Sequence, residues 1–259
     1  MRQLSQVELA QFLIEKADQY AKFSFVQDDP IQIPHAFSSA EDIEISALIA
    51  ATLSWGNRKT IIAKSNDLMD RMDRSPAEFI RSASESDLEA FNGFVHRTFQ
   101  SEDIKGLARG LKMLYQEYES LGAFFKAHVR DGDAHLGHTF QAFKGYLLSN
   151  GLPLRAGKHF GDPSKGSACK RLIMFTRWMV RSNKEGIDFG LWDIDPALLS
   201  LPLDVHSGRV ARSLNLLKRK QNDWKAVEEL DLSIGKIAPK DPARLDYALF
   251  GLGVYEGWK

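Results

Sequence analysis

An aspartate stands at the head of a basic segment in residues 201–217, LPLDVHSGRVARSLNLL. The apolar residues that follow Asp204 recur at helical spacing and predict a short helix. Asp204 suits the N-cap of this helix, because its side-chain oxygen can accept a hydrogen bond from a backbone N–H of the first turn. A carboxylate can also accept a proton or stabilise a developing oxocarbenium ion. The segment by itself leaves both roles open.

A lysine begins a second predicted helix in residues 167–181, SACKRLIMFTRWMVR. Lys170, Arg177 and Arg181 fall on one face of this helix, which would ordinarily be a solvated basic face. Lys170 would lie in the first turn, at the positive end of the helix dipole and beside Arg171. Both effects disfavour the charged ammonium form. A neutral lysine amine is a nucleophile that can form a Schiff base, so Lys170 is a candidate catalytic residue.

Both segments lie in a basic part of an otherwise neutral chain. The whole sequence has 34 Lys and Arg against 34 Asp and Glu, whereas residues 153–221 hold 13 basic and 6 acidic residues, a balance of +7. Base excision from DNA requires this combination: a lysine that attacks the sugar, an aspartate that stabilises positive charge there, and basic residues that hold phosphates. Chance clustering of charge is the alternative interpretation.

The two segments resemble the signature of the helix-hairpin-helix DNA glycosylase superfamily, whose members include endonuclease III. On this resemblance Lys170 takes the position of the family's nucleophile and Asp204 that of its aspartate. Residues 42–69, DIEISALIAATLSWGNRKTIIAKSNDLM, are similar to the family's opening helical pair, and residues 241–253, DPARLDYALFGLG, to its closing helix. The resemblance implies base excision repair of damaged duplex DNA with abasic-site lyase activity.

The chain departs from the family pattern before the lysine. The usual Leu-Pro-Gly-Val-Gly hairpin is replaced by DPSKGSAC at residues 162–169, where Gly166 is the one glycine left. The long spacing from Lys170 to Asp204 is similar to that of the archaeal 8-oxoguanine glycosylases, which lack an iron–sulfur cluster. This resemblance implies an oxidised purine as the damaged base. The chain also resembles a bacterial family without an assigned activity that carries the pattern SACKR…RWMVR…PLDxH…ALFGLG.

Further candidates fall into two groups. Trp55 and Trp192 are candidates for a base pocket, with burial in the core as the alternative for each. Lys165 is the alternative nucleophile, and Cys169 is expected to be a small core residue. The predicted DNA-binding residues are Asn57, Lys165, Gly166, Arg171, Arg177, Arg181, His206, Arg209 and Arg212.

Composition excludes several classes of site. A single cysteine excludes an internal disulfide, a four-cysteine zinc site and a cysteine-ligated iron–sulfur cluster. We expect no metal and no organic cofactor. No apolar run approaches the roughly 20 residues of a membrane helix, and no signal-peptide core is recognisable. We therefore expect a cytoplasmic protein that is a monomer.

Helix signals position these candidates throughout the chain. Capping patterns at Ser5, Ser39 and Ser86 each precede apolar residues, and the segment after Ser39 is apolar enough to be a buried central helix. Amphipathic helices are predicted at about 102–118 and 135–149. The fold class is all-α. On the resemblance we expect two helical lobes, residues 38–150 and residues 1–37 with 151–259, which enclose a cleft with Lys170 and Asp204 on its floor.

The predicted function is a DNA glycosylase that acts through a Schiff base at Lys170. Two alternatives stay open. The altered hairpin would fit a DNA-binding protein that excises nothing, and a chance origin of the basic region would fit a helical protein unrelated to DNA.

Overall fold

The computed structural model describes residues 5–258, which form eleven α-helices, nine 3-10 helices and one two-stranded antiparallel sheet. The predicted all-α class is confirmed. The α-helices are α1 (Gln6–Tyr20), α2 (Ala40–Leu53), α3 (Arg58–Arg71), α4 (Pro76–Ser82), α5 (Ser101–Tyr118), α6 (Leu121–Ala127), α7 (Gly137–Ser149), α8 (Lys170–Val180), α9 (Val205–Ser213), α10 (Trp224–Ile234) and α11 (Leu245–Val254). The 3-10 helices are η1 (Phe23–Asp28), η2 (Pro30–Gln32), η3 (Pro34–Ala36), η4 (Asp87–Phe91), η5 (Leu154–His159), η6 (Pro163–Lys165), η7 (Asn183–Glu185), η8 (Pro196–Leu198) and η9 (Pro242–Arg244), and the strands are β1 (Val95–His96) and β2 (Phe99–Gln100).

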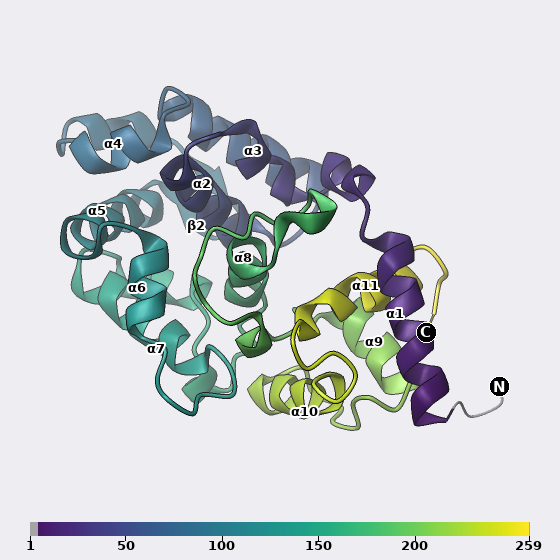
Figure 1. Cartoon of the computed structure of the whole chain (residues 1–259). Coiled ribbons are helices and arrows are strands. Elements are labelled where there is room, and N and C mark those ends of the chain that lie inside the picture. The colour runs from purple at the N-terminus through teal and green to yellow at the C-terminus, as the bar shows by residue number, and fades with distance from the viewer. Residues whose placement is uncertain (1–4, 259) are drawn as a thin grey trace.

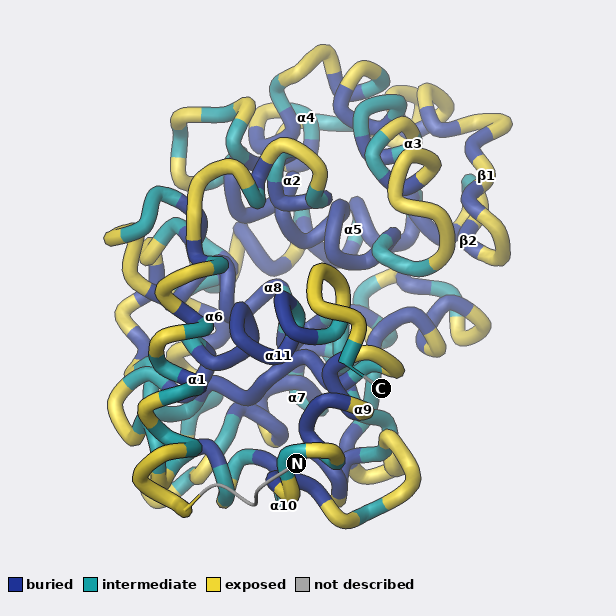
Figure 2. The backbone as a smooth tube through the Cα atoms, turned by 90° about the vertical axis from the view of Figure 1, so that its right-hand side faces the viewer, coloured by how far each residue is buried: buried dark blue, intermediate teal, exposed yellow. Residues whose placement is uncertain are grey.

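Helix α2 runs through the centre of the molecule. Its N-cap is Ser39, whose hydroxyl accepts a hydrogen bond from Asp42 N at 3.1 Å. Residues 43–53 are all buried, as Figure 2 shows by their dark blue colour. The prediction of a buried central helix is confirmed. Helix α8 packs directly against α2, so the helix that carries the candidate lysine rests on the core.

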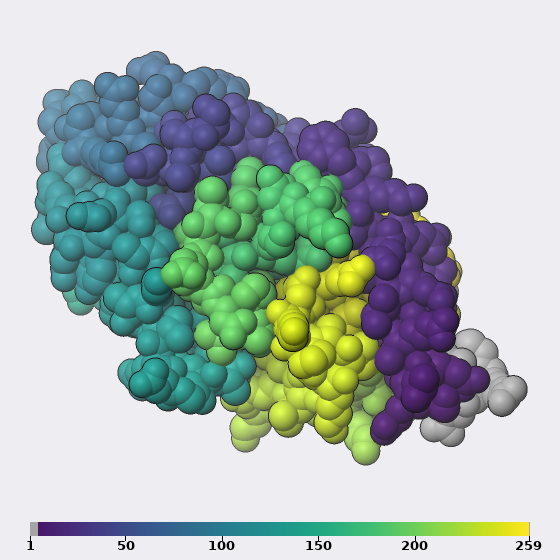
Figure 3. All heavy atoms as spheres, in the orientation of Figure 1, coloured from purple at the N-terminus to yellow at the C-terminus, as the bar shows by residue number. Residues whose placement is uncertain are grey.

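The two ends of the chain lie side by side. Helix α1 packs on α11, and α11 packs on α9, which places the purple and yellow segments together in Figure 3. Close packing depends on Gly251, since a Cβ atom there would lie 2.0 Å from the Tyr20 ring. The predicted capping box of α1 is present, with Ser5 and Glu8 bonded to each other's backbone amides.

Helices α2–α7 occupy one end of the molecule, α1 and α9–α11 the other, and α8 lies between them (Figure 1). The buried apolar side chains of both groups belong to one continuous cluster. The division into two lobes at residues 38–150 and at 1–37 with 151–259 therefore stays a prediction. Residues 1–4 and 259 of that second lobe lie outside the described residues.

One local expectation differs from the structure. Ser86 does not cap an α-helix; instead Ser84 and Asp87 exchange hydrogen bonds at the start of the 3-10 helix η4. The segment before α8, where the sequence departs from the family's hairpin, contains the 3-10 helices η5 and η6 between the end of α7 and Lys170. This segment is rich in Gly and Pro, which favour turns over α-helix.

Candidate active site

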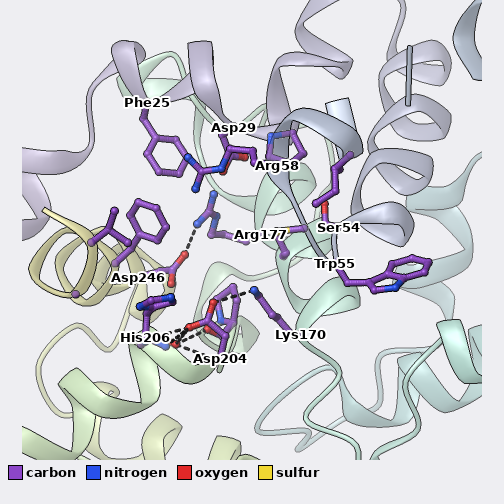
Figure 4. A pocket seen from close by; sticks show the side chains of 18 of the residues that line it. Phe25, Asp29, Ser54, Trp55, Arg58, Lys170, Arg177, Asp204, His206 and Asp246 are labelled. Carbon is purple, nitrogen blue, oxygen red and sulfur yellow. Dashed lines mark hydrogen bonds and ion pairs between the residues drawn. The ribbon is translucent and has the colours of Figure 1, made fainter. Parts of the chain in front are cut away.

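A cavity of about 520 Å³ opens beside the first turn of α8 (Figure 4). This volume falls in the range of small-molecule sites, which is roughly 300–1,000 Å³. Its walls come from the segment before η2, the start of α3, and helices α8, α9 and α11. The charged side chains that line it are Asp29, Arg58, Lys170, Arg177, Asp204 and Asp246.

Lys170 is the first residue of α8 and lies at one side of the cavity. The preceding residue, Cys169, has φ 49° and ψ 25°, a left-handed conformation that turns the chain sharply into the helix. The loop before it is held by Asp162, whose carbonyl accepts the N–H groups of Lys165 and Ser167. The lysine therefore begins from a fixed turn, and its side chain is 39% exposed.

Asp204 uses its two carboxylate oxygens differently. Oδ1 caps α9 by accepting hydrogen bonds from His206 N at 2.8 Å and Ser207 N at 2.9 Å. Oδ2 lies 2.8 Å from Lys170 Nζ, although the two residues are 34 positions apart. Burial acts to raise the pKa of Asp204, but the Lys170 ammonium and the capping N–H groups outweigh it and hold the pKa below the ordinary 3.8. The cap is confirmed, and the contact that the sequence leaves open is present.

Two more carboxyl groups line the cavity. Asp29 Oδ1 accepts a hydrogen bond from Ile31 N at 3.1 Å, and Asp246 Oδ2 accepts one from Arg177 Nη1. Burial raises the pKa of Asp29 and raises that of Asp246 to about 6, against the opposing charge of Arg177. Neither aspartate is a predicted site residue, because Asp29-Pro30 looks like a turn cap and Asp246 like part of an ordinary helix.

Arg177 and Arg181 are not on a solvated face. Both side chains are only 3% exposed, and both pair with Asp188, which is fully buried. Arg181 also pairs with Asp241 at 3.0 Å, so its charge is matched by acids inside the chain. The prediction that Arg177 and Arg181 bind DNA is wrong for this reason, although Arg177 does reach the cavity wall.

The two candidate tryptophans have different surroundings. Trp55 lines the cavity, and its ring packs between other flat groups, with the Arg171 guanidinium 4.9 Å from the ring centre. Trp192 is buried, and its Nε1 donates to the carboxylate of Glu44 at 2.6 Å. Of the two alternatives for Trp192, the structure shows burial in the core and not a position in a base pocket.

Several predicted phosphate contacts are already occupied within the chain. Arg171 donates to the carbonyls of Thr52 and Lys158, and burial lowers its pKa to about 10.

The Gly166 N–H donates to Pro163 O, and the Gly166 carbonyl accepts from Trp224 N, so this glycine does not offer its amide to a phosphate as predicted. Arg212 donates to the carbonyls of Arg219 and Gln221 and to the side chain of Asn222.

The other predicted DNA contacts lie at the surface. Asn57 caps α3 through its Oδ1, while Lys165 and Arg209 are exposed. His206 is exposed and lines the cavity beside Asp204 (Figure 4). The structure thus brings five of the predicted residues to the cavity, namely Trp55, Lys170, Arg177, Asp204 and His206.

The described residues contain neither a metal-binding cluster nor a membrane-spanning helix. Across residues 5–258, no group of three or more His, Cys, Asp or Glu side chains is arranged to hold a metal ion. Within the same range no helix has both the length and the apolar character needed to cross a membrane.

Comparison with known proteins gives one match. No curated protein and no solved structure matches the chain. One family model matches residues 29–255, a segment that contains all four aspartate and lysine residues of the cavity described above. Because this match spans most of the 259 residues, the chain belongs to the family described as "Protein of unknown function (DUF2400)".

Proposed function

We propose that this protein is a DNA base-excision glycosylase with abasic-site lyase activity, and that Lys170 is its nucleophile. One observation carries the proposal: Lys170 Nζ lies 2.8 Å from Asp204 Oδ2 at the edge of a cavity of about 520 Å³. Both side chains remain accessible, at 39% and 29% exposed, so a sugar can reach them. A lysine paired with an oriented carboxylate is the arrangement that covalent amine catalysis needs.

The reaction begins with the proton shared by this pair. Transfer of one ammonium proton from Lys170 to Asp204 leaves a neutral amine. The amine nitrogen then bonds to C1′ of the sugar while the bond from C1′ to the base breaks, and the electron pair of that bond leaves with the base. The C1′–O4′ bond then breaks, one proton of the nitrogen passes to O4′, and the opened sugar is held as a protonated Schiff base. Loss of a C2′ proton from this imine expels the 3′ phosphate, which is the lyase step.

The substrate must bring its base out of the duplex, because an enzyme cannot reach C1′ and the base edge inside the stack. The apolar rings of Phe25 and Phe250 form part of the cavity wall and suit a flat base. Arg58 is exposed and lines the cavity, and Lys165 and Arg209 are exposed elsewhere on the surface, so all three cations are available for phosphates. We further propose an oxidised purine as the damaged base, and a cytoplasmic monomer as the active form.

Borohydride trapping tests the proposal. The wild-type protein is mixed with duplexes that contain 8-oxoguanine, uracil or an abasic site, and borohydride reduces any imine to a stable secondary amine. We expect a covalent adduct that Lys170→Gln abolishes and that Lys165→Gln, a change in the neighbouring exposed loop, retains. Loss of the adduct only in the Lys165 variant would assign the nucleophile to Lys165 instead.

Two other results would replace the proposal. Salt-dependent duplex binding without any adduct would indicate a DNA-binding protein that excises nothing, because phosphate contacts alone produce that dependence. Absence of duplex binding even at low salt would indicate a function unrelated to DNA.

A further inference from the structure

Asp29 presents a carboxyl group to the cavity across from the lysine. In the view of Figure 4 it lies on the other side of the cavity from Lys170 and Asp204. Its Oδ1 is fixed by the hydrogen bond from Ile31 N at 3.1 Å. Within residues 5–258 no side chain donates a hydrogen bond to the Asp29 carboxyl group or forms an ion pair with it, and the Gln32 side chain bonds only to the Asp29 backbone carbonyl. One oxygen of Asp29 is therefore free to meet a ligand.

We propose that Asp29 is the general acid that protonates the departing base. This inference rests on the proposed function, since it assigns the second half of the same reaction. Lys170 and Asp204 act on the sugar, and Asp29 donates a proton to the base that leaves from the opposite side of the scissile bond. The substrate is accordingly a base with an unprotonated ring nitrogen or a carbonyl oxygen that can accept the proton.

The presence or absence of an ion-pair partner distinguishes Asp29 from Asp246, another carboxyl group that lines the cavity. Asp246 is bonded to Arg177, whose guanidinium is buried and needs a carboxylate partner. Protonation of Asp246 would leave Arg177 with Asp188 as its remaining charge partner and would break a buried ion pair, which is costly. Asp29 has no such partner, so it can hold a proton and release it. Asp246 acts through Arg177 as a positioning residue.

Surrounding charges set the proton affinity of Asp29. Burial raises its pKa, and the positive charges of Arg177, Arg58 and Lys170 oppose the rise without cancelling it. The charged or titratable side chains that line the cavity with Asp29 are Arg58 on α3, Lys170 and Arg177 on α8, Asp204 and His206 at the start of α9, and Asp246 on α11.

The surroundings of Asp29 and Asp204 therefore shift the pKa values of these two carboxyl groups in opposite directions. The pKa of Asp204 is lowered by its cation and N–H donors, whereas that of Asp29 is raised by burial. Two carboxyl groups whose environments separate their pKa values divide the acid and base roles of a reaction between them. Asp204 therefore suits the role of proton acceptor, and Asp29 suits the role of proton donor.

The step balances in protons and electrons. The C1′–N bond breaks, and its electron pair goes to the base. The proton on the free oxygen of Asp29 moves to the base, which leaves neutral, and Asp29 becomes a carboxylate. Lys170 forms the new bond to C1′ after its own proton has passed to Asp204. Exchange with water returns both aspartates to their starting states.

The test separates base departure from lyase chemistry, because an abasic site has no base to protonate. Asp29→Asn keeps an oxygen that can accept the Ile31 N–H. We expect it to slow excision of 8-oxoguanine and uracil from duplexes by about 100-fold or more, the usual contribution of a general acid. We expect cleavage and trapping of the abasic duplex to stay within about twofold of wild type. Asp28→Asn, a change at the exposed neighbouring acid, should leave both activities unchanged.

The pH profile gives a second readout. A group that acts as an acid must be protonated, so wild-type excision should fall as the pH rises through the Asp29 pKa, and Asp29→Asn should lack that fall. Equal loss of both activities in Asp29→Asn, or loss of neither, overturns the role of Asp29. A wild-type protein that traps on the abasic duplex and excises no base overturns the glycosylase half of the proposed function and this inference with it, whereas the Asp29→Asn results above overturn this inference alone. A wild-type protein that does neither overturns the proposed function with it.

Discussion

The two ends of helix α8 carry the same kind of residue in opposite settings. At its start, Lys170 pairs with Asp204 beside the cavity, and the two side chains are 39% and 29% exposed. At its end, Arg181 pairs with Asp188 and Asp241 and is only 3% exposed. Lys170, at the start of the helix, can exchange its partner for a ligand, whereas Arg181, at the end, cannot.

This difference indicates two roles for the ion pairs of α8: a ligand can displace the pair at the start of the helix, and the pairs at its end hold the helix in place. An exposed ion pair contributes about 0–1 kcal/mol to stability, so a substrate can displace it at little cost. A buried pair resists the loss of either partner, because the remaining charge stays in a site of low polarity. The buried arginines fix the axis of α8, and the fixed axis aims Lys170 at Asp204.

The largest effect is expected at the buried end. Arg181→Met leaves Asp188 and Asp241 short of a cation, and we expect the free energy of unfolding to fall by about 3–5 kcal/mol. Urea unfolding followed by circular dichroism measures it. Arg209→Met, at an exposed position on α9, is the matched control and should change stability by less than about 0.5 kcal/mol. A similar small change in both variants would remove the distinction between the two ends.

Substitution of Asp204 should have an intermediate effect on stability. Two different substitutions distinguish the roles of its two carboxylate oxygens. Asp204→Ala removes the cap of α9, which costs about 0.5–2 kcal/mol of unfolding free energy. Asp204→Asn keeps an oxygen for the cap and should cost less, while it still loses most of the trapping activity because the charge beside Lys170 is gone. Equal stability of the two variants would show that the cap contributes little.

Lys170→Gln should affect stability least among these substitutions. Because the pair is partly exposed, we expect the free energy of unfolding to change by less than about 1 kcal/mol, while the borohydride adduct disappears. The same urea experiment measures the stability. A loss as large as that of Arg181→Met would mean that the lysine, too, is an anchor.

A small pH dependence should follow from the same pair. The folded-state pKa of Asp204 lies below the ordinary 3.8, so its stabilising contribution is present above that value and is lost as the pH falls through the folded pKa. The stability difference between wild type and Lys170→Gln should therefore shrink as the pH is lowered below about 4. Unfolding midpoints measured between about pH 2 and pH 6 test this. A difference that grows in acid would contradict it.

Local signals in the sequence predict the helix starts at Lys170 and Asp204 well. Lys170 and Asp204 each begin a helix, and turn and cap residues make helix starts readable in the sequence. Their contact depends on how α8 and α9 pack, which the sequence leaves open. The buried central helix after Ser39 is equally readable, because its apolar residues cover every face.

Long-range partners explain the wrong predictions. Arg177 and Arg181 look like a solvated stripe until Asp188, Asp241 and Asp246 converge on them from three other segments. Asp29 is missed for a related reason. Its neighbour Pro30 favours a turn, and only the folding of that turn against α3 and α8 brings the carboxyl group to the cavity.

The loop before Lys170 has a further consequence for binding. The amides of Lys165, Gly166 and Ser167 all donate within the loop, and Gly166 O accepts from Trp224 N. These amides should exchange slowly with deuterated water, although Lys165 and Gly166 are exposed. Since the loop is already ordered, little conformational entropy remains to be lost when a ligand docks beside it. The lysine is therefore presented by a rigid support before any substrate arrives.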